Sequence, residues 1–260
     1  MNNRWKIILI ASFLAFFMEY SLRGINGFLR EPAMAILVFA NYFTYLVLIE
    51  EFIGRFKLKD YQVWVIAGFF TLLWQLVSVS GIYWPPFVLG INIYQLVLNN
   101  VIWWPTLQTV FALYIAHRVI SDVDRTKSLL NKYGIALFFA LYFIVSVSWR
   151  LFVTPPVTPW QFLIVLTFTC LFALFSYRLI FSNIKRKVEL ATFKPDKFLD
   201  VIAVIMVIFL IFSFLFLIDS GTSTPHLINR RALIANIIVS PLIALALFLR
   251  RIISKKPISI

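Results

Sequence analysis

Eight apolar segments, each long enough to cross a bilayer as a helix, dominate the chain. They lie at roughly 5–22, 33–53, 61–80, 100–117, 133–152, 160–181, 198–219 and 232–249. A hydrocarbon core about 30 Å thick needs about 20 helical residues, since each residue rises about 1.5 Å. Of the 260 residues 62% are hydrophobic and 13% charged, so little sequence remains for a soluble domain. The pattern predicts an all-α polytopic membrane protein with about eight transmembrane helices.

The basic residues are distributed unevenly between the two ends of these segments. Of the 24 lysines and arginines, 19 fall at the N-terminus, in the loops after segments two, four and six, and in the C-terminal tail. The positive-inside rule therefore predicts that both termini are cytoplasmic, at the cytoplasmic membrane in a prokaryote. The first segment runs into Glu19 and Arg23 without a small-residue cleavage site, which indicates a retained helix. Because membrane topology accounts for the net charge of +13, we expect no nucleic-acid partner.

Polar groups interrupt the apolar sequence mainly in one stretch, residues 74–109. Its distinctive features are Trp84-Pro85-Pro86, the pair Asn99-Asn100, the pair Trp103-Trp104, and Pro105. Polar groups at membrane depth must be satisfied internally or line a cavity. This stretch therefore predicts the position of the site.

A short pattern recurs in the second part of the chain. Asn100-Val-Ile-Trp-Trp-Pro105 is echoed by Asn236-Ile-Ile-Val-Ser-Pro241, 136 residues later, and each copy opens the last helix of a four-helix half. This predicts a parallel duplication, with residues 1–120 as the first half and 121–260 as the second. The site would then lie between the halves, near the outer surface.

The residues of this stretch carry a family resemblance. Trp74, Gly81, Trp84, Pro86, Val88-Leu89-Gly90-Ile91 and the Asn99-Asn100 pair before Trp103-Trp104 follow one another in order. This order resembles the lycopene cyclase domain of the membrane-embedded type, a family of duplicated helical halves. In the second half the match is carried by Asp219, Gly221, Asn236 and Pro241. The resemblance implies a carotenoid or other isoprenoid lipid as ligand. If the protein is an enzyme, we expect cofactor-independent isomerisation, cyclisation or hydration of that lipid.

The chain departs from the family at the acids. The family has Pro-x-Glu-Glu where this chain has Val97-Leu98-Asn99-Asn100. Cyclising a polyene requires a carboxylic acid that protonates a double bond, which asparagine cannot do. The candidate catalytic residues are therefore Asp219, which stands where the family tends to carry an aspartate, and Glu19. The simpler interpretation is that both acids pair with arginines at the interface.

Further outer-side residues are candidates for binding the ligand. Amides can bind a hydroxyl or carbonyl group, tryptophans offer π-faces, and arginines pair with anionic groups. The candidate binding residues are Asn99, Asn100, Asn236, Trp84, Trp103, Trp104, Arg23, Arg150 and Arg230. Interhelical hydrogen bonds, an aromatic belt and helix-end snorkelling are the simpler explanations.

Other functions stay open or are disfavoured. Glu50-Glu51-x-x-x-Arg55 has the spacing of intramembrane CAAX-type proteases, but the two histidines, His117 and His226, are predicted on opposite faces. They also make a histidine metal site improbable, and we expect neither metal nor cofactor. The alternatives to an isoprenoid-binding protein are a transporter or lipid carrier and a non-catalytic subunit of a membrane complex. The oligomeric state, homo- or hetero-oligomeric, is left open.

Overall fold

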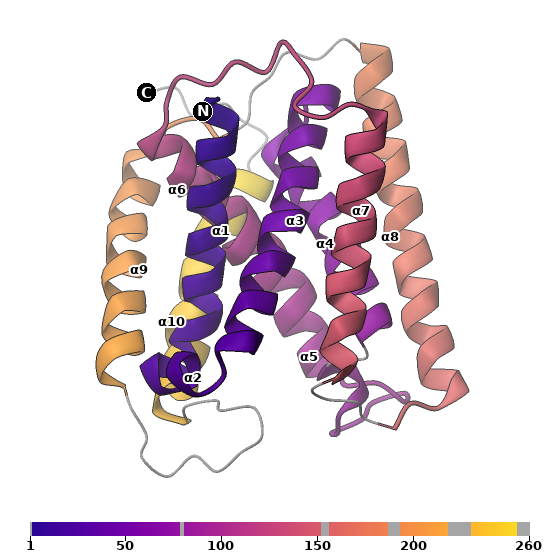
Figure 1. The fold of residues 1–260 in the computed structure, drawn as a ribbon, viewed down its shortest axis with the longest axis vertical. Helices are drawn as coiled ribbons and strands as arrows, with labels where there is room; N and C mark the ends of the chain where they lie inside the picture. The colour runs from indigo at the N-terminus through magenta and orange to yellow at the C-terminus, as the bar shows by residue number, and fades with distance from the viewer. Residues whose placement is uncertain (1, 79–80, 152–155, 187–192, 218–229, 254–260) are drawn as a thin grey trace.

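The computed structural model describes the chain except residues 1, 79–80, 152–155, 187–192, 218–229 and 254–260, and is helical throughout (Figure 1). The long helices are α1 (Asn3–Ser21), α3 (Pro32–Phe56), α4 (Asp60–Ser78), α7 (Lys132–Ser148), α8 (Pro159–Arg186), α9 (Lys197–Phe216) and α10 (Arg230–Leu247). Shorter elements are α2 (Gly24–Arg30), η1 (Gly81–Tyr83), α5 (Ile93–Val97), α6 (Ala112–Val119) and η3 (Trp149–Leu151). Two π-helical segments, η2 (Leu98–Phe111) and η4 (Phe248–Ile253), complete the described fold.

The described helices confirm an all-helical fold with several apolar helices of membrane-spanning length. Seven of them are long and apolar enough to cross a bilayer, and they coincide with the predicted segments from the second to the eighth. Helix α1 lies at the first predicted segment but carries Arg4, Lys6 and Glu19, and it is not among the seven. The total of eight crossings therefore stays a prediction.

Polar residues at the helix termini explain where several helices begin and end. Asn2, Asn92 and Asn131 each accept a hydrogen bond from a backbone N–H in the first turn of α1, α5 and α7. Side-chain caps of this kind satisfy N–H groups that have no partner within the helix. Helix α3 begins with Pro32 and ends at Lys57, whose left-handed conformation stops the helix.

The helices of the two predicted halves contribute differently to the interior. In the spans of α3, α4 and η2–α6, 61–67% of the most apolar window is buried, against 11–28% in the spans of α7 to α10. Helix α1 packs against α3 and α6. The first half thus supplies most of the interior, and α7 to α10 present much of their apolar surface outward. The arrangement into two similar halves stays a prediction.

The end of the bundle that holds the start of α1 is joined by buried charges, and we call it the basic end. Glu50 is fully buried and accepts hydrogen bonds from Arg4 at 3.1 Å and from both Nε and Nη2 of Arg125 at 2.8 Å. Neighbouring Glu51 pairs with Arg55 at 2.7 Å and accepts the backbone N–H of Leu129 at 2.8 Å. These bonds fasten the loop between α6 and α7 across the ends of α1 and α3 (Figure 1).

The same contacts bear on the protease alternative. Both glutamates are held by arginines, as expected for the pair Glu51 and Arg55, and the described histidine, His117, accepts a hydrogen bond from Arg125 at 2.6 Å. His226 lies outside the described residues. Carboxylates bonded in this way tie helices together, and they leave little capacity to activate a water molecule.

Candidate functional site

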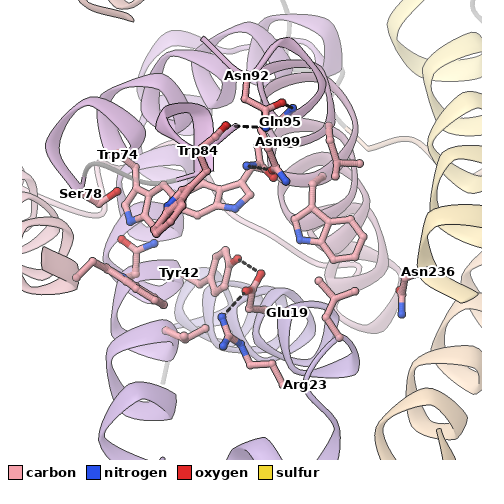
Figure 2. Close-up of a pocket in the computed structure, with 18 of the residues that line it drawn as sticks. Glu19, Arg23, Tyr42, Trp74, Ser78, Trp84, Asn92, Gln95, Asn99 and Asn236 are labelled. Atoms are coloured by element: carbon pink, nitrogen blue, oxygen red, sulfur yellow. Dashed lines mark hydrogen bonds and ion pairs between the residues drawn. The ribbon is translucent and has the colours of Figure 1, made fainter. Parts of the chain in front are cut away.

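A cavity of about 440 Å³ lies at the opposite end of the bundle, which we call the cavity end. Its walls come from α1, α3, α4, the segment 81–92, α5, η2, η3 and α10. Figure 2 shows side chains from separate parts of the chain facing one another across it, with Glu19 and Tyr42 opposite Asn99 and Gln95. The predicted polar stretch, residues 74–109, supplies about half of the lining residues. The volume is of the size that small ligands occupy in proteins.

Aromatic rings form one wall of the cavity. Trp74 packs against Trp104, with ring centroids 4.9 Å apart, and against Trp149 in an edge-on contact at 5.8 Å. Tyr42 lies on the other side of Trp104 at 5.3 Å. Trp103 also lines the cavity and is 6% exposed. Such a wall offers flat apolar surfaces to a ligand.

A partly buried ion pair provides the charged part of the lining. Arg23 donates a hydrogen bond to Glu19 at 3.2 Å, one helical turn away, and the hydroxyl of Tyr42 donates to the other carboxylate oxygen at 3.5 Å (Figure 2). This confirms the expectation that Glu19 and Arg23 meet on one helix face. The pair brings one negative and one positive charge, so together they add no net charge to the cavity.

Amide side chains form another wall of the cavity. Asn92 caps α5 and donates to the backbone carbonyl of Trp84 at 2.9 Å, which fixes the loop that carries Trp84 and Pro85. Asn99 donates to the side-chain oxygen of Gln95 at 3.1 Å, one turn before it (Figure 2). Local hydrogen bonds therefore hold these amides at the cavity surface.

The π-helix η2 presents both tryptophans of its sequence to the cavity. Pro105 lacks a backbone N–H, and Thr106 and Thr109 donate from their hydroxyls to the carbonyls of Val101 and Trp104, five residues earlier. These side-chain bonds stabilise a wide turn that is rare and often found at functional sites. The altered winding buries Trp103 and Trp104 together, each 6% exposed.

Asn236 reaches the cavity from α10. Its amide donates to Ala232 at 2.9 Å and to Ser213 of α9 at 3.4 Å, and Ser213 in turn donates to the backbone carbonyl of Ser21 at 2.8 Å. Asn100, its counterpart in the repeat, likewise donates to the carbonyl four residues earlier, Leu96, at 2.9 Å. The two copies of the Asn-x-Ile-x-x-Pro pattern thus share one local hydrogen bond.

The structure brings most of the predicted site residues together. Those that line the cavity are Glu19, Arg23, Trp84, Asn99, Trp103, Trp104 and Asn236. Asn100 is buried but is not part of this lining, and Arg150, also outside it, donates to the backbone carbonyl of Val77 at 2.7 Å. Asp219 and the side chain of Arg230 lie outside the described residues.

Sequence reasoning missed several lining residues. Asn41 and Tyr42 lie within the apolar segment of α3, and Trp149 lies at the start of η3. A polar residue in the middle of a predicted span was the available signal for the first two. Trp149 could not be distinguished from an aromatic belt without the packing of its ring against Trp74.

The described residues contain no group of three or more histidine, cysteine, aspartate or glutamate side chains that could hold a metal ion. The site is instead an aromatic and amide-lined cavity with one ion pair. Comparison with known proteins adds no name to this geometry, because no protein-family model, curated protein or solved structure matches the chain.

Proposed function

We propose that the protein binds one end of an isoprenoid lipid, such as a carotenoid, in the cavity at the end of its membrane bundle. The observation that supports this most is the combination of tryptophan faces with amide groups in a cavity of about 440 Å³ within a membrane-spanning fold. Rings pack well on branched and conjugated chains, and amides bind an oxygen at the chain end. The resemblance of residues 74–109 to the lycopene cyclase domain favours the same ligand class.

The orientation follows from the charges. The basic end carries Arg4, Arg55, Lys57, Lys59 and Arg125, and we infer that it faces the cytoplasm. The cavity end then faces the outer side, with access from the outer leaflet.

A variant that fills the cavity tests this function. Ser78 is 2% exposed and lines the cavity, so Ser78→Phe places a ring inside it. Thr167→Phe is the matched control, because Thr167 lies on the outward face of α8. Native mass spectrometry of gently purified protein should release an isoprenoid from the wild type and from Thr167→Phe, but not from Ser78→Phe. Absence of any bound lipid, or equal retention by both variants, would reject the proposal.

A second candidate, proton transfer on the bound lipid, rests on Glu19. It is the carboxyl group among the described lining residues, and Tyr42 donates to it. A cyclisation needs both an acid and a base, so a second group would have to act together with Glu19. Expression in a lycopene-accumulating host tests this candidate. Conversion of the pigment that disappears in Glu19→Gln while lipid binding persists would support it, and unchanged pigment with well-folded wild type would reject it for lycopene.

A further inference from the structure

Several buried polar atoms of the described residues that line the cavity have no hydrogen-bond partner, and more of them are donors than acceptors. The indole N–H groups of Trp74, Trp103 and Trp149 are buried, and none has a hydrogen-bond partner among the residues that the structure describes. All three rings line the cavity. An indole nitrogen can only donate a hydrogen bond. A buried donor without an acceptor is unfavourable, so these groups indicate an acceptor supplied by something that enters the cavity.

Two further buried groups complete this set. The hydroxyl of Ser78 and the amide oxygen of Asn41 line the cavity, and neither has a partner within the described part of the chain. Both side chains are 2% exposed. Asn41 contributes the acceptor oxygen of this group, and Ser78 can donate or accept. Three donor-only groups therefore stand against one acceptor-only group.

The charges of the lining narrow the ligand further. The guanidinium of Arg23 is paired with the carboxylate of Glu19, so the two bring no net positive charge for a phosphate or carboxylate head. An alcohol oxygen accepts hydrogen bonds too, but its own O–H would have to be directed at Asn41 or Ser78, whereas the three indole groups need acceptors only. A carbonyl oxygen accepts from two N–H groups and donates none. Trp74 and Trp149 are adjacent, with ring centroids 5.8 Å apart, and both carry such groups.

We propose that the cavity binds an uncharged, carbonyl-bearing end group of an isoprenoid lipid, a ketone or quinone, through the indole N–H groups of Trp74, Trp103 and Trp149. This proposal rests on the proposed function and specifies the chemistry of the ligand's polar end. The aromatic wall of Trp74, Trp104 and Tyr42 would pack against the ring or chain that carries the carbonyl.

Three probes with one geranyl chain separate the possibilities. Geranyl-1,4-benzoquinone offers acceptors only, geranylhydroquinone offers donors as well, and geranylbenzene offers neither. Titration calorimetry of the full-length protein in detergent gives the affinity for each. We expect the quinone to bind about tenfold more tightly than either of the others, since each hydrogen bond changes an affinity by a factor of about two to ten.

Variants then assign the preference to the N–H groups. Trp103→Phe removes an unpartnered N–H, and we expect the ratio of quinone to geranylbenzene affinity to fall about threefold or more. Val38→Ala is the matched control, because Val38 is 2% exposed and lines the same cavity, but its side chain has no hydrogen-bonding group. That variant should weaken both probes alike and keep the ratio. Helical circular dichroism and gel filtration establish that each variant is folded.

The outcomes distinguish the two proposals. If quinone and geranylbenzene bind the wild type equally, or if Trp103→Phe and Val38→Ala change the ratio alike, the carbonyl proposal is overturned and isoprenoid binding stands. If Ser78→Phe abolishes binding of all three probes, their site is the cavity. If none of the probes binds the wild type and no lipid is released from it, the proposed function itself fails.

Discussion

Replacement of Arg4 by methionine should destabilise the bundle more than almost any other single substitution at the basic end. The guanidinium of Arg4 is 1% exposed and donates to the carboxylate of Glu50 at 3.1 Å, to the backbone carbonyl of Glu50 at 2.8 Å and to that of Lys127 at 2.8 Å. Breaking a buried pair by removing one partner costs about 3–5 kcal/mol, because a charge stays buried without compensation. Arg125 still pairs with Glu50 in the variant, so we expect a value near the lower limit, about 3 kcal/mol.

Arg118→Met is the matched control for this experiment. Arg118 pairs with Asp200 at 2.8 Å at the same end, but the two side chains are 39% and 30% exposed. Exposed pairs contribute about 0–1 kcal/mol. Reversible unfolding in mixed detergent micelles, followed by helical circular dichroism, measures both free energies. Equal effects of Arg4→Met and Arg118→Met would refute the view that the buried cluster holds this end together.

Three further predictions concern the packing of the helices. Gly54→Ala places a Cβ 2.7 Å from the Nη2 atom of Arg4. It should lower the free energy of unfolding by about 1–3 kcal/mol in the wild type and by clearly less in the Arg4→Met background, where the guanidinium is absent. Additive costs in the double-mutant cycle would contradict this. Asp196→Asn tests a pH dependence: burial raises the pKa of Asp196, but hydrogen bonds from Arg250, Leu199 and Phe198 outweigh it, so the folded pKa lies below its usual value. The carboxylate therefore adds stability above the unfolded pKa of about 4, which is lost as the pH falls through the folded pKa. The variant should be less stable at pH 7 and lose less stability on acidification, and an unchanged pH profile in unfolding titrations would count against it. Asn236→Ala should cost about 0.5–1.5 kcal/mol, since it removes the bond to Ser213 of α9, and no measurable cost in the same assay would mean that the bond is replaced.

Helix positions could be predicted closely because they depend on local sequence. The predicted segment 61–80 is α4, Asp60–Ser78, and the predicted segment 198–219 is α9, Lys197–Phe216. An apolar run of fixed minimal length has few alternatives to a helix in a membrane. The pairs Glu19–Arg23 and Glu51–Arg55 could be expected for the same reason, since residues four apart share a helix face.

Contacts between distant segments could not be predicted in this way. Glu50 pairs with Arg4, 46 residues away, and with Arg125, 75 residues away, and no local pattern selects these partners. The unequal burial of the two predicted halves is also a property of packing, because both halves contain similar apolar runs. At the candidate site, the polar stretch 74–109 indicated the end of the bundle where the cavity lies, whereas Tyr42 and Trp149 join it only through the arrangement of α3 and η3.

The buried charges of the basic end have a mechanical consequence for the cavity. Strong bonds at one end of a long helix make that end a pivot, while the other end moves in proportion to the helix length. Helix α3 has 25 residues, and Pro32 at its far end lies about 27 Å from Glu50, so a tilt of about 5° about the Glu50 cluster moves that end by about 2 Å. At the cavity end, Asn236 of α10 donates a hydrogen bond of 3.4 Å to Ser213 of α9. Both groups are uncharged, so this bond breaks more easily than the charged bonds at the basic end. Opening of the cavity would then be a scissor-like motion of the helices, with most of its amplitude at the cavity end and little at the basic end.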